Sequence, residues 1–268
     1  MVSMVQTRAG EVAYSDAGEG PVVVLLHATL HDRRDFDAIV PSLRHDHRVI
    51  ALDWPGHGDS PAPVPNYQPT AASFADVLAD VVATLDLPPA ALVGNSVGGF
   101  AAARLAITDP QRVSRLVLVN SGGFIAGPVA KLYCRTLGMP SVMKRVLPRF
   151  VRSYMKATSD NDYAVQERVL ARANTRDGVS LTAALWRSFA APEYDLRPGA
   201  DRITAPCLVI WGSKDTAIPM RFGRATAAAI AGSRLEVLPT GHIPFSSDAA
   251  GFLAIAAPFL AAARGSVQ

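Results

Sequence analysis

Runs of mostly apolar residues recur along the chain, and between them apolar residues fall three and four positions apart. In chain order, these runs cover residues 22–26, 47–52, 91–93, 115–119, 207–211 and 234–238. Polar and apolar residues do not alternate within the runs, which is typical of strands buried on both faces of a parallel sheet. Residues 6–14 precede the first run, and we expect them to form a leading antiparallel hairpin.

The segments between the runs predict helices. From Thr70 to Leu85, the apolar side chains repeat at helical spacing and form one stripe. Helices are also expected over residues 97–107, 221–231 and 249–263. Strand and helix units repeated in this way predict an α/β fold with a doubly wound sheet.

The alternation stops between residues 123 and 202. This stretch has no convincing buried strand, but it carries helical patterns at 142–154 and 179–189. We therefore expect a core built from residues 1–122 and 203–268. Residues 123–202 would form a helical cap, or lid, over the sheet.

Composition narrows the class of protein. Of 268 residues, 49% are apolar and 18% charged, so a sizeable core can be buried. The net charge of +3 gives no case for a nucleic-acid partner. Cys134 and Cys207 form no metal-binding cluster and are expected to be buried thiols.

The first ten residues lack a signal-peptide core, and no uncharged apolar run reaches the ~20 residues of a membrane span. These features predict a cytoplasmic protein without a membrane span.

The segment Gly94-Asn-Ser96-Val-Gly98 lies between a predicted strand and a predicted helix. A Gly-x-Ser-x-Gly turn in this context is the nucleophile-elbow pattern, in which strained backbone geometry projects the serine hydroxyl from the carboxyl edge of the sheet. The helix begins at Val97, whose backbone N–H is left free to stabilise charge near Ser96. Ser96 is therefore the candidate nucleophile.

A serine nucleophile needs a base, and the base needs an orienting carboxylate. Of six histidines, only His242 follows a late strand, and Asp215 follows the strand before it. The order Ser96, Asp215, His242 is the order of the α/β-hydrolase triad. Asp215 as the N-cap of the following helix, and His242 as a turn histidine, remain the alternatives. His57 lies in a glycine-rich loop and is expected to be structural.

These motifs together resemble the α/β-hydrolase superfamily over about residues 22–260. The resemblance rests on the triad segments, on His27-Ala28-Thr29 and on the loop from Asp53 to Ser60. It implies an eight-stranded, mostly parallel sheet, a helical lid, and acyl transfer without a cofactor. It also implies that the Thr29 N–H is the second oxyanion donor beside Val97, although Ala28 replaces the usual glycine. His27 itself is interpreted as a residue that braces its loop.

The expected activity is hydrolysis of a small or medium carboxylic ester, with lactones or thioesters included. A serine at the elbow argues against the dehalogenases and epoxide hydrolases of this fold, which use an aspartate. The elbow is also similar to that of meta-cleavage-product hydrolases, so C–C bond hydrolysis is the alternative, with Arg168 as the candidate for binding a substrate carboxylate. Ile243 replaces the aromatic residue common there. A ligand sensor with a slow triad is a third hypothesis.

The predicted lid carries seven basic residues and no acidic residue between Gly122 and Thr158. This pattern is typical of a solvated helical face. The sharper hypothesis is a patch that attracts a carboxylate-bearing substrate or an acidic carrier protein. Several lid and rim residues are candidates for lining an acyl pocket or for the core: Phe124, Leu137, Tyr154, Trp186 and Phe189.

Overall fold

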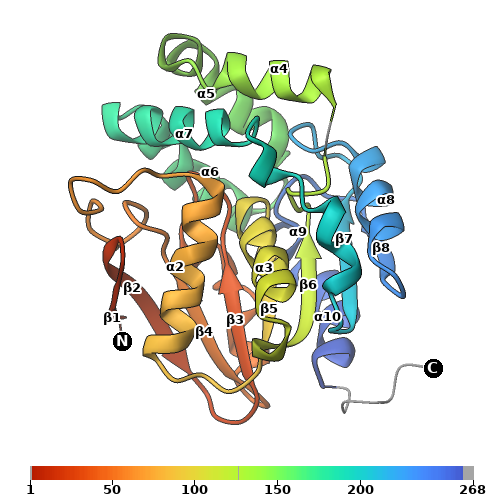
Figure 1. The fold of residues 1–268 in the computed structure, drawn as a ribbon. Coiled ribbons are helices and arrows are strands. Elements are labelled where there is room, and N and C mark those ends of the chain that lie inside the picture. Colours follow the sequence, from red (N-terminus) through yellow and green to blue (C-terminus); the bar gives the residue numbers. More distant parts are fainter. Residues whose placement is uncertain (1, 126, 262–268) are drawn as a thin grey trace.

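The computed structural model describes residues 2–125 and 127–261, which form an α/β fold around one eight-stranded sheet (Figure 1). The strand order is β1-β2-β4-β3-β5-β6-β7-β8. The strands are β1 (Val2–Thr7), β2 (Gly10–Ala17), β3 (Val22–Leu26), β4 (Arg48–Leu52), β5 (Ala90–Asn95), β6 (Val113–Val119), β7 (Cys207–Gly212) and β8 (Arg234–Leu238). The pairs β1–β2 and β2–β4 are antiparallel and the others are parallel. The expected hairpin and the mostly parallel sheet are both confirmed.

Each central strand buries side chains on both faces of the sheet. In β3, Val24 and Leu26 belong to one hydrophobic cluster, whereas Val23 and Leu25 belong to the other. All five residues of β3 are buried. Because neighbouring side chains point to opposite faces, a strand covered on both sides reads as a continuous apolar run.

Helices cover the two faces. The first face carries α2 (Ala71–Thr84), α3 (Val97–Thr108) and α8 (Met220–Ala229). The second carries α1 (Val40–Leu43), α9 (Pro244–Ser247) and α10 (Ala249–Ala261), and Figure 1 shows α10 behind the sheet with α2 and α3 in front. The predicted residues 262 and 263 of the last helix lie outside the described range. Short 3₁₀ turns η1 (Arg33–Phe36) and η2 (Pro110–Arg112) complete the connections.

Four helices lie between β6 and β7: α4 (Pro128–Leu137), α5 (Pro140–Met155), α6 (Asp160–Ala173) and α7 (Arg176–Ser188). They form a layer above the carboxyl ends of the parallel strands (Figure 1). Two 3₁₀ turns, η3 (Pro192–Tyr194) and η4 (Arg197–Arg202), lead from this layer back to β7. In the part of the chain that the structure describes, no helix is both long and apolar enough to cross a membrane.

Candidate active site

Ser96 occupies a sharp turn between β5 and α3. Its φ of 57° and ψ of −114° lie in a region that L-residues rarely adopt. The backbone around it holds this conformation: the Ser96 N–H donates to Val119 O at 3.1 Å, and Ser96 O accepts from Gly122 N at 3.0 Å. A strained conformation persists only where its surroundings fix it, and such strain is typical of functional sites.

The glycines around Ser96 are required by close packing. A Cβ atom at Gly98 would overlap the carbonyl oxygen of Leu26, and one at Gly94 would overlap the carbonyl oxygen of Gly98. The first turn of α3 therefore packs directly against the ends of β3 and β5. This contact keeps Ser96 at the carboxyl edge of the sheet.

His242 is hydrogen-bonded to Asp215 across two loops. His242 Nδ1 lies 2.7 Å from Asp215 Oδ2, and both side chains are buried. Asp215 Oδ2 also accepts from Asn120 Nδ2 at 2.6 Å, while Oδ1 accepts from the backbone N–H groups of Ala217 and Ile218. Because the carboxylate of Asp215 also accepts from Nδ1 of His242, that nitrogen carries the ring proton, and Nε2 is free to act as a base.

The alternative prediction made Asp215 the N-cap of the following helix, α8. Its carboxylate does accept from backbone N–H groups, but these belong to the turn ahead of α8, whose N-cap is Pro219. One oxygen holds that turn and the other holds His242. The turn and the histidine are thus positioned by the same side chain.

A cavity of about 610 Å³ lies between the sheet and the helical layer, and Ser96, His242 and Thr29 all line it. Most of its other walls are apolar. Of the five residues left open between pocket and core, Tyr154, Trp186 and Phe189 line the cavity, whereas Phe124 and Leu137 are buried without being among its lining residues. The charged residues on its wall are Lys131, Arg221 and Asp195, the last of which is paired with Arg197.

Arg168 differs from its expected role. Its Nη2 donates to Asp35 Oδ1 at 3.1 Å and its Nε lies 3.5 Å from Asp32 Oδ2. Arg168 is not among the described residues that line the cavity. Two carboxylates on the loop after β3 already occupy this guanidinium, so a substrate carboxylate would have to displace them.

The two proposed oxyanion donors lie near Ser96 in different ways: Val97 follows it in the chain, and Thr29 lines the same cavity. Val97 is the first residue of α3, where backbone N–H groups have no partner within the helix. Thr29 lies on the loop after β3 and lines the cavity. Its Oγ1 is buried and has no hydrogen-bond partner within the described residues.

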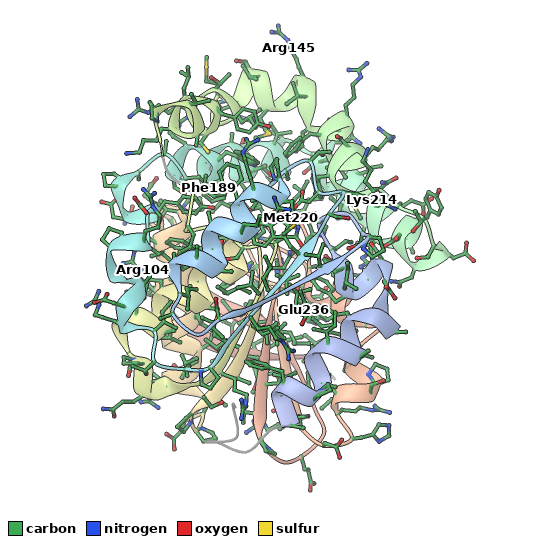
Figure 2. All side chains as sticks on the ribbon, turned by 90° about the vertical axis from the view of Figure 1, so that its right-hand side faces the viewer. Arg104, Arg145, Phe189, Lys214, Met220 and Glu236 are labelled. Atoms are coloured by element: carbon green, nitrogen blue, oxygen red, sulfur yellow. The ribbon has the colours of Figure 1, made fainter. Side chains whose placement is uncertain are left out.

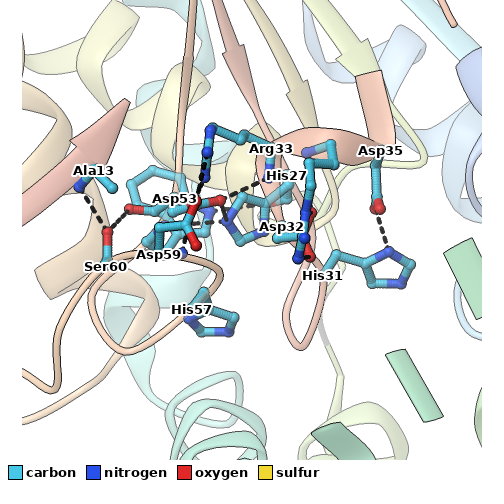
Figure 3. A network of polar contacts seen from close by, with 12 residues as sticks. Ala13, His27, His31, Asp32, Arg33, Asp35, Asp53, His57, Asp59 and Ser60 are labelled. Atoms are coloured by element: carbon cyan, nitrogen blue, oxygen red, sulfur yellow. Dashed lines mark hydrogen bonds and ion pairs between the residues drawn. The ribbon is translucent and has the colours of Figure 1, made fainter. Parts of the chain in front are cut away.

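Two buried histidines, His27 and His57, fix the loop that carries Thr29; both rings are labelled in Figure 3. His27 Nε2 accepts from Trp54 N at 3.0 Å, and His57 Nε2 accepts from Leu30 N at 3.1 Å. Leu30 has a φ of 78°, so the loop turns sharply just after Thr29. Both rings brace loops, as the sequence predicts for His27 and His57.

Asp53 fixes the same loop from the neighbouring strand. It is fully buried, and it bonds the Arg33 side chain and accepts from Arg33 N at 2.7 Å and Asp59 N at 2.9 Å (Figure 3). A buried charge with this many partners tolerates little movement. The loops after β3 and β4 therefore form one rigid unit beneath Thr29.

The sequence did not single out the two asparagines that connect the site. Asn120 bonds Asp215 and also accepts from Gly212 N at 3.0 Å, and Asn95 Nδ2 donates to His242 O at 3.0 Å. Both residues sit at strand ends, next to Val119 and Ser96. That position is a usable signal, because polar residues at the carboxyl ends of parallel strands gather at one edge.

The described residues contain no group of three or more His, Cys, Asp or Glu side chains arranged to hold a metal ion. Each histidine described above bonds a carboxylate or a backbone group.

Comparisons with known proteins match nearly the whole chain. A family model described as alpha/beta hydrolase fold matches residues 21–249. A pimeloyl-[acyl-carrier protein] methyl ester esterase of Neisseria meningitidis is 33% identical over 251 residues, covering 89% of this chain and 93% of that protein. A 2-hydroxy-6-oxononadienedioate/2-hydroxy-6-oxononatrienedioate hydrolase of Cupriavidus pinatubonensis is 32% identical, covering 83% and 81%. The crystal structure of the enol-lactonase from Burkholderia xenovorans is similar with a TM-score of 0.78 and 29% identity, covering 96% of this chain and 99% of that one.

Proposed function

Because this chain belongs to the alpha/beta hydrolase fold family, we propose that it hydrolyses carboxylic esters with Ser96 as nucleophile, His242 as general base and Asp215 as the orienting carboxylate. The proposal is carried by one observation: Ser96, in its strained turn, and His242, paired with Asp215, line the same cavity. Relatives that are an esterase and an enol-lactonase support the same class of reaction.

In the first half of the reaction, His242 Nε2 takes the proton of the Ser96 hydroxyl as the oxygen attacks the ester carbonyl carbon. Asp215 stabilises the imidazolium that forms. The developing oxyanion accepts from the N–H groups of Val97 and Thr29, each contributing about 3 kcal/mol to lowering the barrier. The tetrahedral intermediate then releases the alcohol, which takes its proton from His242, and leaves an acyl group on Ser96.

In the second half, a water molecule gives a proton to His242 and attacks the acyl carbon. The carboxylic acid leaves and the proton returns to Ser96 Oγ. The helical layer α4–α7 acts as the lid in this proposal, because α4, α5 and α7 line the cavity opposite the sheet. Its volume of about 610 Å³ and its apolar wall fit a small or medium acyl group, on an ester, lactone or thioester.

C–C bond hydrolysis by the same triad is the second candidate, and the relative from Cupriavidus pinatubonensis favours it. The engagement of Arg168 with Asp32 and Asp35 weighs against it, since that removes the proposed ligand of a substrate carboxylate. Ester hydrolysis needs no such ligand and is the better supported of the two.

A set of chromogenic substrates tests this proposal. The wild-type protein and Ser96→Ala are incubated with p-nitrophenyl esters of short and medium acyl length, and with a coloured vinylogous diketo acid. We expect turnover of the esters by the wild-type protein and a loss of at least ~10⁴-fold in Ser96→Ala. Bleaching of the diketo acid alone would support the second candidate. A single burst without turnover would favour a sensor, and ester turnover that survives in Ser96→Ala would contradict the assigned nucleophile.

A further inference from the structure

Tyr154 lies beside His242 at the wall of the cavity. It belongs to the last turn of α5, its side chain is buried, and it lines the cavity. The centres of the Tyr154 and His242 rings are 5.3 Å apart with an interplanar angle of 72°, an edge-to-face contact. The ring of Tyr154 thus limits how far the His242 imidazole can rotate or move toward α5.

The hydroxyl of Tyr154 is held by a second buried His–Asp pair. Tyr154 Oη lies 2.9 Å from His31 Nε2, and His31 Nδ1 bonds the carboxylate of Asp35, as Figure 3 shows for the latter contact. Asp35 also accepts from Arg168. Because the carboxylate of Asp35 accepts from Nδ1 of His31, that nitrogen carries the ring proton and Nε2 accepts from the Tyr154 O–H.

The backbone of Tyr154 contacts the His242 loop directly. Its carbonyl oxygen accepts from His242 N at 3.0 Å. A Cβ atom at Gly241 would overlap the carbonyl oxygens of Tyr154 and Met155, so the loop packs tightly on the end of α5. One residue earlier, Ser153 Oγ lies 2.9 Å from Thr216 Oγ1, next to Asp215.

His31 also belongs to the loop that carries Thr29, since its N–H donates to Ala28 O at 3.3 Å. Tyr154 is therefore the point at which α5 joins two loops. Its hydroxyl bonds the loop of the proposed oxyanion donor, and its carbonyl and ring contact the loop of the proposed base. Neither His31 nor Asp35 has a part in the ester chemistry described above, and neither is among the described residues that line the cavity.

We propose that Tyr154 is a positioning residue for His242, and that the His31–Asp35 pair holds the Tyr154 ring in place. The inference rests on the proposed function. With the hydroxyl anchored, the ring supports the imidazole in the position that it holds beside Asp215 on the cavity wall, and the loop of Thr29 keeps its place relative to that base. Without the anchor, the ring can move toward the cavity and the imidazole loses its support. A misplaced imidazole lowers kcat, whereas substrate binding and KM are little affected.

The test uses Tyr154→Phe, His31→Asn and the double variant. Each single change removes the hydrogen bond but leaves the Tyr154 carbonyl and an aromatic ring at position 154. With the best ester of the set above, we expect kcat to fall roughly tenfold in each single variant with KM within about twofold. The double variant should be no slower than the slower single variant, because both changes break the same contact.

Tyr163→Phe is the matched control, since Tyr163 is an exposed tyrosine on the neighbouring helix α6. It should leave kcat and KM unchanged. An unchanged kcat in Tyr154→Phe, a change in KM alone, or losses that multiply in the double variant would overturn the inference. If a variant at position 154 or 31 fails to fold, Asp35→Asn weakens the same chain of contacts with almost no change of shape.

A second readout separates this inference from the proposed function. The proton NMR resonance of the His242 Nδ1–H, assigned with His242→Gln, reports the imidazole position without any turnover. We expect it to shift or broaden in Tyr154→Phe and to stay fixed in Tyr163→Phe. A wild-type protein that hydrolyses no ester defeats the proposed function, whereas an unchanged resonance in Tyr154→Phe defeats only the positioning role.

Discussion

The backbone N–H groups of Trp54 and Leu30 point at imidazole nitrogens of His27 and His57. An imidazole that accepts from a backbone N–H must keep that nitrogen unprotonated. Burial also lowers the pKa of His27, and it lowers the pKa of His57 well below its ordinary value. Both residues are therefore neutral in the folded protein, as the bracing of the Thr29 loop requires.

This neutrality makes stability depend on pH. The pKa of a histidine in the unfolded chain is about 6.5, and burial holds the pKa of His57 lower in the folded protein. Below a pH of about 6.5 the unfolded state binds more protons than the folded state, so the free energy of unfolding falls as the pH decreases. Above a pH of about 6.5 the stabilisation is fully present. We expect the Tm to drop between pH 7 and pH 5 and the drop to be smaller in His57→Gln, whose amide oxygen can still accept from Leu30 N. An equal drop in both proteins would contradict the assignment.

The three catalytic candidates could be identified from the sequence because short patterns next to them in the chain mark them. Ser96 is marked by its glycines, and Asp215 and His242 by their positions after strands. Tyr154, Asn120 and the His31–Asp35 pair have no comparable signal, because each acts through a partner far away in the chain. Arg168 shows the limit of a resemblance: similarity to meta-cleavage-product hydrolases suggested that it binds a substrate carboxylate, whereas in the structure its guanidinium contacts two aspartates after β3.

Among the elements, α5 presents two different faces. Met143, Leu147, Val151 and Tyr154 are buried, while Arg145, Arg149 and Arg152 recur at intervals of four and three residues and are exposed. Figure 2 shows Arg145 projecting from the outer side of the helical layer. We propose that this basic surface attracts an ester that carries a carboxylate or an acidic carrier protein, and the relative that acts on a pimeloyl-[acyl-carrier protein] methyl ester fits that hypothesis.

Charge reversal tests this surface. Arg145→Glu with Arg149→Glu should raise KM several-fold for an ester that bears a distal carboxylate and leave KM for a neutral ester of equal length nearly unchanged, with the difference shrinking at high salt. The control reverses Arg44 and Arg234, two exposed arginines outside the helical layer. Equal effects on both esters would leave the basic residues as a solvated face.

Elements were predictable where burial is regular. The parallel strands were located because both of their faces are covered, and α5 and α7 because each buries a regular stripe. Helix α4 has no such stripe, since within it only Leu137 is buried. Helix α6 buries side chains at helical spacing, but only Val165 and Val169 among them are large and apolar, and Asp162 interrupts the apolar pattern. Contacts with neighbouring helices of the layer stabilise α4 and α6. Such contacts cannot be recognised from the sequences of the two helices alone.

For the whole molecule, the sheet order explains why distant residues meet. Strands β5, β6, β7 and β8 are adjacent and parallel, so the segments after them emerge at one edge. These segments carry Ser96, Asn120, Asp215 and His242. The positions of the three catalytic candidates after strands were therefore sufficient to predict that they lie at one edge of the sheet, whereas the contacts of α4, α5 and α7 that complete the cavity were not predictable without coordinates.

Covalent labelling of Ser96 is the most direct test of the proposal that His242 activates this serine as a nucleophile. The protein is treated with a fluorophosphonate, which captures a serine only when a base activates it, and the adduct is located by peptide mass mapping. We expect one adduct, on Ser96, that is absent in Ser96→Ala and forms at least ~100-fold more slowly in a folded His242→Gln variant. An adduct on another residue, or an unchanged labelling rate without His242, would contradict it.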